Sequence, residues 1–413
     1  MRPILQRQRA RRAWTAVATL VIAIGFTLPC DAAAAAPAAP SNYATDMAAF
    51  IAEVDTAYPY LDLKGIRADW SAARVRLAAG AKACRSDTEF LGFVIDGMRC
   101  LRDAHMGLGD LKAKAPDSPP LYYSGVSFLP AVNNGVVVMA APPAYEKALP
   151  VGTVVTEIDG KDARQVLDGR VKEAWARGGS FSSPQRARLF EYRTPLAGPK
   201  KDEPHRITYL AGKTKQTVVL TATIEVRGWA HVYNLPANLT RVGQSLYFTK
   251  LPGGAGYLYI RRADEGMGPG MAEALAKVPD AKGWIVDLRG NGGGGYDEAV
   301  VKAIQAFPRP VAVLIDAGCI SAGETLARDF ARYAGGRLFG TSTAGSSSSK
   351  RQWTFPSGIA TVTFSVRSRF RTDNKPIEFN GIEPDVLVEE VPAEMARGGN
   401  SAILRAEEFL KKP

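Results

Sequence analysis

The stretch PVAVLIDAGCISAGETLARDFARYAG, from Pro310 to Gly335, changes from an apolar run to a helical pattern within a few residues. Its first part, PVAVLID, indicates a strand, and its second part, SAGETLARDFARYAG, indicates a helix that begins at Ser321. A strand, a short loop and a helix in this order form the repeating unit of layered α/β folds. The stretch therefore predicts an α/β core in this part of the chain.

The same alternation extends over residues 243–395. GAGYLYIRR, GWIVDL and IATVTFSVRSRF indicate further strands, and GMAEALAKVP and DEAVVKAIQAF indicate further helices. Loops at the ends of neighbouring strands in such a layer face the same way, and active sites gather there. The loops DLRGNGGGGYDE (287–298) and DAGCISAGE (316–324) are therefore the expected place of a functional site.

Upstream of this core the patterns predict two further domains, so the fold class is multidomain α+β. Residues 42–111 indicate an N-terminal helical domain with a capping box at SDTE, and KAKAPDSPP (112–120) has the composition of a linker. Residues 119–228 contain short strand-like runs, ending in the expected hairpin RITYLAGKTKQTVVLTATIEV. Residues 170–205 show no clear periodicity, and residues 396–413 are expected to form a C-terminal helix.

The N-terminus is typical of an export signal. Five arginines and no acid precede the apolar run TAVATLVIAIGFTLP, and small residues follow it. Residues 1–36 are therefore predicted to be a signal peptide, and the mature protein is expected to be periplasmic or secreted without a stable membrane span. Removal of residues 1–40 lowers the net charge from +11 to +7. The remaining Lys and Arg are scattered among acids, which argues against a nucleic-acid site.

Three cysteines lie outside the signal. In an exported protein Cys84 and Cys100 form either a disulfide or two buried thiols, and the sequence leaves both open. Cys319 is then expected to be a small core residue beside the loop that begins the helix at Ser321.

The glycine loop has two interpretations. Its G-x-G-x-x-G spacing, from Gly290 to Gly295 after a strand, fits a dinucleotide site with Asp316 near the ribose. The motif starts late in an exported chain, however, which disfavours that interpretation. The alternative is an oxyanion site, because successive glycines let backbone N–H groups approach a developing negative charge.

Ser321 also has two interpretations. Ser321-Ala-Gly-Glu324 fits a capping box, and most such serines only cap a helix. A serine at a helix N-terminus is also suited to nucleophilic attack, because the partial positive charge there favours an oxyanion. A serine hydroxyl needs a base at neutral pH.

Four motifs resolve these alternatives by resemblance. In order and spacing, WIVDLRGNGGGG, ISAGETLARDF, LFGTSTAG and NKPIEFNGIEPDV resemble the tail-specific (C-terminal processing) serine peptidases, as does LRDAHMGL upstream. The resemblance covers roughly residues 85–395 and implies that Ser321 attacks the scissile carbonyl. It also implies a ClpP/crotonase-like α/β core and a PDZ-like middle domain.

The resemblance implies a histidine base. One branch of the family has a lysine 25 residues after the serine, where this chain has Ser346, and its nearest lysine there is Lys350. The branch similar to tricorn protease and the interphotoreceptor retinoid-binding protein modules has an L-x-D-x-H loop instead, here ending at His105. His205 and His231 have no comparable context.

The remaining site residues are implied by the same resemblance. Glu378 is the implied orienting acid, with Asp103 or Glu383 as alternatives. The implied oxyanion donors are the N–H groups of Ala322 and Gly294, with Gly293 as an alternative. A peptide-terminus loop of the PDZ-like domain corresponds to Gly125, Val126, Ser127 and Phe128.

The expected function is peptide-bond hydrolysis through an acyl-enzyme, with a polypeptide substrate and neither a metal nor an organic cofactor. The alternative class is a non-enzymatic periplasmic binding protein for peptides or apolar ligands. Loss of Ser321, His105 or the glycine loop would favour that alternative, and the sequence retains all three.

Overall fold

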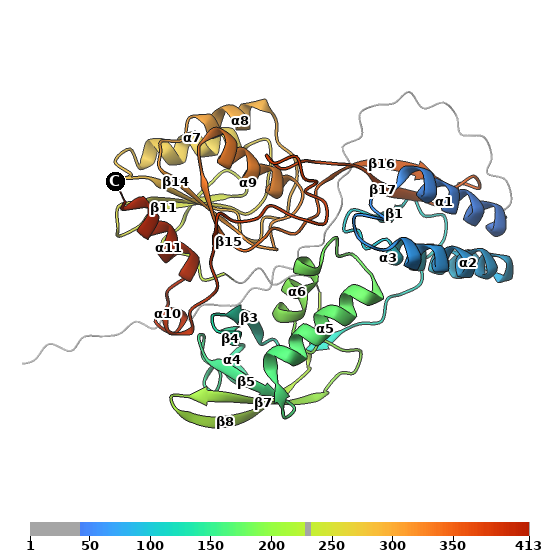
Figure 1. The fold of residues 1–413 in the computed structure, drawn as a ribbon, viewed down its shortest axis with the longest axis horizontal. Helices are drawn as coiled ribbons and strands as arrows, with labels where there is room; N and C mark the ends of the chain where they lie inside the picture. The colour runs from blue at the N-terminus through green and yellow to red at the C-terminus, as the bar shows by residue number, and fades with distance from the viewer. Residues whose placement is uncertain (1–41, 228–232, 413) are drawn as a thin grey trace, which may run out of the picture.

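The computed structural model describes residues 42–227 and 233–412, so the predicted signal peptide and His231 lie outside the described residues. The described chain divides into three bodies: an N-terminal helical body, a middle β body and a C-terminal α/β body (Figure 1). Each has its own cluster of buried apolar side chains. The chain is thus the mixed α/β, multidomain protein that the sequence predicts.

The C-terminal body is built on a seven-stranded sheet with strand order β10-β11-β12-β13-β14-β15-β18. β10, β11 and β12 pair antiparallel, and the strands from β12 to β18 pair parallel. The strands are β10 (Thr240–Val242), β11 (Leu246–Lys250), β12 (Gly256–Ile260), β13 (Trp284–Asp287), β14 (Val311–Ile315), β15 (Arg337–Gly340) and β18 (Val386–Leu387). The helices are α7 (Met267–Lys277), α8 (Glu298–Gln305), α9 (Ala322–Tyr333), α10 (Pro392–Ala396) and α11 (Ser401–Leu410).

Helices cover both faces of this sheet. In β14, Val311 and Val313 belong to the apolar cluster that includes α7, α8 and α9. Ala312 and Leu314 belong instead to the cluster that includes α11. Alternate residues of a strand point to opposite faces, so the continuous apolar run of β14 is explained by burial on both sides.

The N-terminal body combines three helices with a hairpin from the far end of the chain. The helices are α1 (Tyr43–Ala57), α2 (Arg67–Ala83) and α3 (Asp87–Cys100), and the strands are β1 (Gly107–Gly109), β16 (Ser348–Thr354) and β17 (Thr361–Ser368). The strand order is β1-β17-β16, and Phe355 and Phe364 pack in one cluster with Phe50 of α1. The strand predicted at IATVTFSVRSRF is therefore present, but it leaves the C-terminal sheet to cover the N-terminal helices.

The middle body contains a six-stranded sheet and two longer helices. Its elements are β2 (Tyr122–Tyr123), β3 (Ser127–Ala131), β4 (Gly135–Ala140), α4 (Pro143–Glu146), β5 (Val154–Ile158), β6 (Lys161–Asp162), α5 (Ala163–Arg177), α6 (Pro184–Arg193), β7 (Pro204–Ala211), β8 (Thr214–Thr221) and β9 (Ile224–Glu225). The sheet order is β3-β4-β5-β7-β8, with β6 beside β5 and a separate β2–β9 pair. The predicted hairpin is confirmed as β7–β8. The PDZ-like arrangement stays a prediction.

Half of the segment without clear periodicity (170–205) is helical, in α5 and α6. In α6 the buried residues include Arg186, Glu191 and Arg193, so charged side chains stand where an apolar stripe is expected. These buried charges explain why the sequence pattern gave no helix prediction there.

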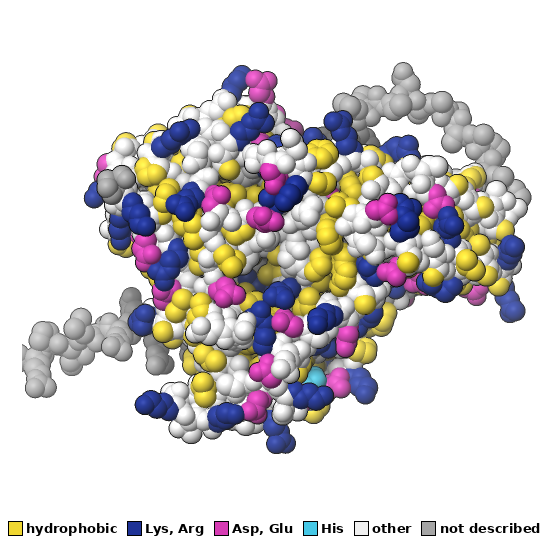
Figure 2. Space-filling view, viewed as in Figure 1, with side chains coloured by type: hydrophobic (Ala, Val, Ile, Leu, Met, Phe, Trp, Pro, Cys, Tyr) yellow, Lys and Arg dark blue, Asp and Glu magenta, His cyan; other side chains and the backbone are white. Residues whose placement is uncertain are grey.

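The surface and the cysteines agree with a folded, mixed-charge protein. On the visible face, Lys and Arg side chains lie scattered among Asp and Glu (Figure 2). Cys84, Cys100 and Cys319 are free thiols, so the Cys84–Cys100 disulfide is not formed, and Cys319 is buried as expected. Within the described ranges, no helix is both long enough and apolar enough to cross a bilayer.

Candidate active site

Ser321 lies at the loop that joins β14 to α9, where it caps the N-terminus of the helix. Its φ angle is +58°, a backbone conformation that costs free energy in a residue other than glycine. Its backbone N–H donates to the carbonyl of Ser346 at 2.9 Å. The hydroxyl of Ser347 donates to the carbonyl of Ser321 at 3.3 Å. The loop that follows β15 therefore holds Ser321 from both sides of its backbone.

The carboxylate of Glu324 organises this loop. It is fully buried and accepts hydrogen bonds from the N–H groups of Gly345 (2.7 Å) and Ser346 (2.8 Å). It also accepts from the hydroxyl of Thr343 (2.6 Å) and from the N–H of Ser321 (3.2 Å). Burial raises the pKa of Glu324 to about 7, although these donors favour the ionised form. The sequence suggested only helix capping for Glu324, whereas in the structure its carboxylate joins the backbone of Ser321 to the loop after β15.

The glycine loop approaches Ser321 directly. A β-carbon placed on Gly293 would lie 2.9 Å from the β-carbon of Ser321, and the φ angle of Gly293 is +76°. Only glycine meets both constraints without strain. The N–H of Gly293 donates to Oδ1 of Asn291 at 3.0 Å, so Gly293 is already engaged within the loop. Which of Gly293 and Gly294 donates to an oxyanion stays a prediction.

His105 lies in the loop between α3 and β1. Its backbone N–H donates to Oδ1 of Asp103 at 2.8 Å, and its Nδ1 is buried without a hydrogen-bond partner among the described residues. Burial lowers the pKa of His105 to about 4; the charges of Lys350 and Lys64 act in the same direction, and that of Asp103 opposes them. The imidazole is therefore neutral at neutral pH, the form that accepts a proton.

A row of serines connects the loops of Ser321 and His105. Ser347 bonds to the backbone of Ser321, the next residue Ser348 bonds through its hydroxyl to that of Ser365 (2.7 Å), and Ser365 donates to Oδ1 of Asp103 (3.1 Å). No hydrogen bond joins the His105 ring to the Ser321 hydroxyl in the described part of the chain. Such catalytic contacts are often long until substrate binds.

Glu378 is fully buried, and its partner is Lys64 rather than His105. Nζ of Lys64 lies 2.8 Å from Oε1 of Glu378 and 3.8 Å from Oδ2 of Asp103. Burial and the charge of Asp103 raise the pKa of Glu378, while Lys64 opposes this shift. The expected direct pairing of Glu378 with His105 is not formed, because a carboxylate in a dry pocket pairs with the ammonium beside it. Its role as orienting acid stays a prediction.

The other candidates occupy less central places. Lys350 is exposed on β16, and Glu383 lies outside the cluster, paired with Arg371 at 3.2 Å. Val126 and Phe128 are fully buried in the apolar cluster of the middle body, and the hydroxyl of Ser127 donates to the carbonyl of Arg193. A peptide at this loop would therefore meet backbone and Gly125 rather than these side chains.

Sequence reasoning missed the residues that bring the loops together. Ser182, just before α6, accepts the N–H of Ala104 through its hydroxyl at 3.1 Å, and Ser183 donates to the carbonyl of Ala344 at 2.6 Å. Gln185 donates to the carbonyl of Phe379 at 3.0 Å. One short segment of the middle body thus contacts the loop of His105, the loop after β15 that holds Ser321, and the loop of Glu378. Only the Ser183-Pro184 helix start marked it in the sequence.

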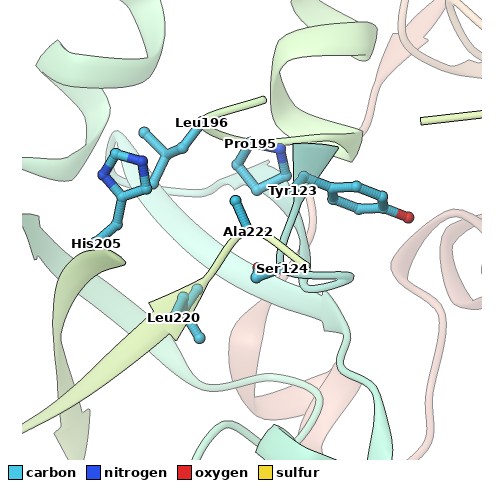
Figure 3. Close-up of a pocket in the computed structure, with 7 residues that line it drawn as sticks. All are labelled: Tyr123, Ser124, Pro195, Leu196, His205, Leu220 and Ala222. Carbon is cyan, nitrogen blue, oxygen red and sulfur yellow. The ribbon is translucent and has the colours of Figure 1, made fainter. Parts of the chain in front are cut away.

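A small cavity of about 10 Å³ lies away from this cluster, in the middle body (Figure 3). Its lining includes His205 and Tyr123, and none of the candidate catalytic residues. Nδ1 of His205 lies 2.9 Å from a carboxylate oxygen of Asp159, so this histidine has a partner of its own. The room suffices for about one water molecule.

The chain is similar to known peptidases in part of its sequence and in its fold. Residues 254–307 and 301–388 match the model of peptidase family S41. A structure of mature CPAF complexed with lactacystin is similar, with a TM-score of 0.59, 13% identity, and coverage of 90% of this chain and 97% of that chain. A putative peptidase from Parabacteroides merdae is also similar, with a TM-score of 0.51, 14% identity, and coverage of 90% and 98%. At these identities the structures establish a shared fold. No curated protein matches the chain in sequence.

We expect Gly293→Ala to lower the rate at which Ser321 is labelled by a fluorophosphonate at least about tenfold, because the new methyl group overlaps the β-carbon of Ser321 and strains a positive φ. The rate is followed by gel fluorescence and the adduct is located by mass spectrometry. Gly292→Ala is the matched control, since a β-carbon there meets nothing within 4 Å. Equal rates in both variants would contradict the close approach.

Proposed function

We propose that this chain is a serine peptidase of family S41, with Ser321 as nucleophile and His105 as general base, because residues 254–307 and 301–388 match the model of that family. The observation that carries the proposal is the backbone of Ser321. It is held at a positive φ on the N-terminus of α9, with the glycine loop packed against its side chain. Strained residues of this kind cluster at active sites.

In the proposed reaction, Oγ of Ser321 forms a bond to the scissile carbonyl carbon while His105 takes the hydroxyl proton. The tetrahedral intermediate then collapses, the C–N bond breaks, and His105 gives the proton to the leaving amine. Water, deprotonated by the same imidazole, hydrolyses the acyl-enzyme and restores the serine. The low pKa of His105 supports its role as a neutral acceptor at the start of each half-reaction.

The proposed oxyanion donors are the backbone N–H groups of Ala322 and Gly294. Ala322 is the first residue of α9, and the first N–H groups of a helix have no intrahelical acceptor. Gly294 follows Gly293, whose own N–H is engaged by Asn291. Two such donors stabilise a developing negative charge on the carbonyl oxygen.

Two carboxylates support His105 in this proposal. Asp103 accepts the backbone N–H of His105 and thereby fixes the loop. Glu378 lies in the same buried cluster, joined to Asp103 through Lys64, and is proposed as the orienting acid. An acceptor of this kind holds the imidazole and stabilises the imidazolium.

We expect His105→Ala to lower the rate of fluorophosphonate labelling at Ser321 at least about a hundredfold, because the hydroxyl loses its base. Labelling of the purified protein is followed over time, and the adduct is mapped by mass spectrometry. His205→Ala is the control, since this histidine pairs with Asp159 in the middle body. Ser321→Ala removes the adduct altogether.

Two other outcomes would change the assigned base or the proposed function. Labelling that survives loss of His105 would return the base to Lys350 or another group. A folded protein without any adduct at Ser321 would favour the alternative function, a binding protein for peptides or apolar ligands.

We further propose that the middle body reads the C-terminus of its substrate as a PDZ-like module. β3 is an edge strand of its sheet, and apart from the bridge between Ala131 and Glu390 at its end, its outer edge offers backbone groups to an added strand. A peptide with a free C-terminus is expected to bind to the Ser321→Ala variant at least about tenfold more tightly than the same peptide amidated, measured by fluorescence anisotropy. Equal affinities would contradict C-terminal recognition.

Export is proposed from the sequence of residues 1–36. The full chain, expressed in a bacterium with a periplasm, is expected to lose these residues and appear outside the cytoplasm. N-terminal sequencing of the fractionated protein checks this, with a mature start expected between Ala33 and Ser41. An intact N-terminus in the cytoplasmic fraction would contradict it.

A further inference from the structure

Lys64 is a buried cation that belongs to no part of the proposed reaction. It lies in the turn between α1 and α2, and its side chain has no solvent exposure. Its ammonium donates to the carbonyl of Arg102 at 2.7 Å and to the hydroxyl oxygen of Tyr58 at 2.9 Å. It also lies 2.8 Å from Oε1 of Glu378. The ammonium thus makes two hydrogen bonds and one close ion pair, all with residues near the His105 loop.

The ammonium faces two buried carboxylates. Asp103 and Glu378 lie 3.8 Å and 2.8 Å away, and the rings of Tyr58 and Tyr60 flank the nitrogen at 5.6 Å and 5.5 Å from their centroids. Burial lowers the pKa of His105, and the charges of Lys350 and Lys64 lower it further. Buried charges persist only where partners compensate their lost hydration.

These contacts join loops from opposite ends of the chain. Arg102 has a positive φ of +48°, and the carbonyl that Lys64 holds lies just before Asp103 and His105. Glu378 belongs to the loop that follows β17, near the residues that α6 contacts. Lys64 therefore fixes the position of the His105 loop relative to the C-terminal body.

We propose that Lys64 is a positioning residue for His105, whose ammonium holds the Arg102–His105 loop against Glu378 through the contacts to the Arg102 carbonyl and the two carboxylates. The inference rests on the proposed function, because it takes His105 as the base. Lys64 touches neither Ser321 nor the reacting atoms; it acts through the carbonyl of Arg102 and through Asp103 and Glu378.

Loss of the Lys64 charge is expected to change the pH dependence of activity, which distinguishes this role from a purely structural one. Lys64 lowers the pKa of both Asp103 and Glu378, so without the ammonium the two buried carboxylates raise each other's pKa further. One of them then keeps a proton until a higher pH. Tyr58 and Tyr60 cannot replace the cation, because a protonated phenol is neutral, and burial raises the pKa of both side chains so that they stay protonated.

We expect Lys64→Met to lower kcat at neutral pH at least about tenfold with little change in KM, and to move the acidic limb of the kcat profile to higher pH. A fluorogenic peptide that the wild type cleaves is the substrate; the rate of fluorophosphonate labelling at Ser321 gives the same profile independently. A purely structural loss reduces the amplitude and leaves the limb in place.

Arg170→Met is the matched control. Arg170 pairs with the buried carboxylate of Glu191 at 2.9 Å in the middle body, so this variant also leaves a carboxylate without its cation. Its activity profile is expected to match the wild type. Urea unfolding of both variants shows whether their losses of stability are comparable.

Tyr58→Phe keeps the proposal testable if Lys64→Met does not fold. It removes one acceptor of the Lys64 ammonium and a hydroxyl that donates to the carbonyl of Leu101 at 2.9 Å. A smaller shift of the acidic limb in the same direction is expected. An unchanged limb and kcat in folded Lys64→Met, or an unchanged limb in Tyr58→Phe, would overturn the role of Lys64. Absence of labelling at Ser321 in the wild type would instead overturn the proposed function.

Discussion

The geometry of the site depends on one buried carboxylate, that of Glu324. It collects donors from two loops, namely the N–H of Ser321 at the start of α9 and the N–H groups of Gly345 and Ser346 after β15. A carboxylate without water needs such donors, and the donors need an acceptor, so each side constrains the other. The strained backbone of Ser321 persists because this arrangement over-determines it.

The second constraint lies between the bodies. The hairpin of β16 and β17 extends the Ser346 loop away from the C-terminal sheet and buries Phe364 against Phe50 in the N-terminal helices. Those helices lead directly into the His105 loop, and Gly107–Gly109 then pair with β17. The hairpin thus joins the loop that holds Ser321 to the small sheet and the core beside His105, even though the two residues lie far apart in the sequence.

The middle body also contacts the loops around the candidate site. Ser182, Ser183 and Gln185 hydrogen-bond to the loops of His105, Ser321 and Glu378, and Arg186 is buried with a hydrogen bond to the carbonyl of Ala317. Each of the three bodies therefore contributes polar contacts to the candidate site. Buried polar contacts of this kind specify a relative orientation more strongly than apolar packing does, because each unpaired partner is costly.

The sequence by itself determined the local features of this protein. The strand–loop–helix order around Ser321, the glycine loop and the β7–β8 hairpin follow from short-range periodicity and turn residues, which depend on neighbours along the chain. Only the tertiary structure decided that Lys64 pairs with Glu378, that β17 covers the N-terminal helices, and that α6 buries charged residues. Such contacts join residues that are distant in sequence. Their free energy depends on how both partners lose water together in the folded protein, and a local sequence pattern contains no information about that.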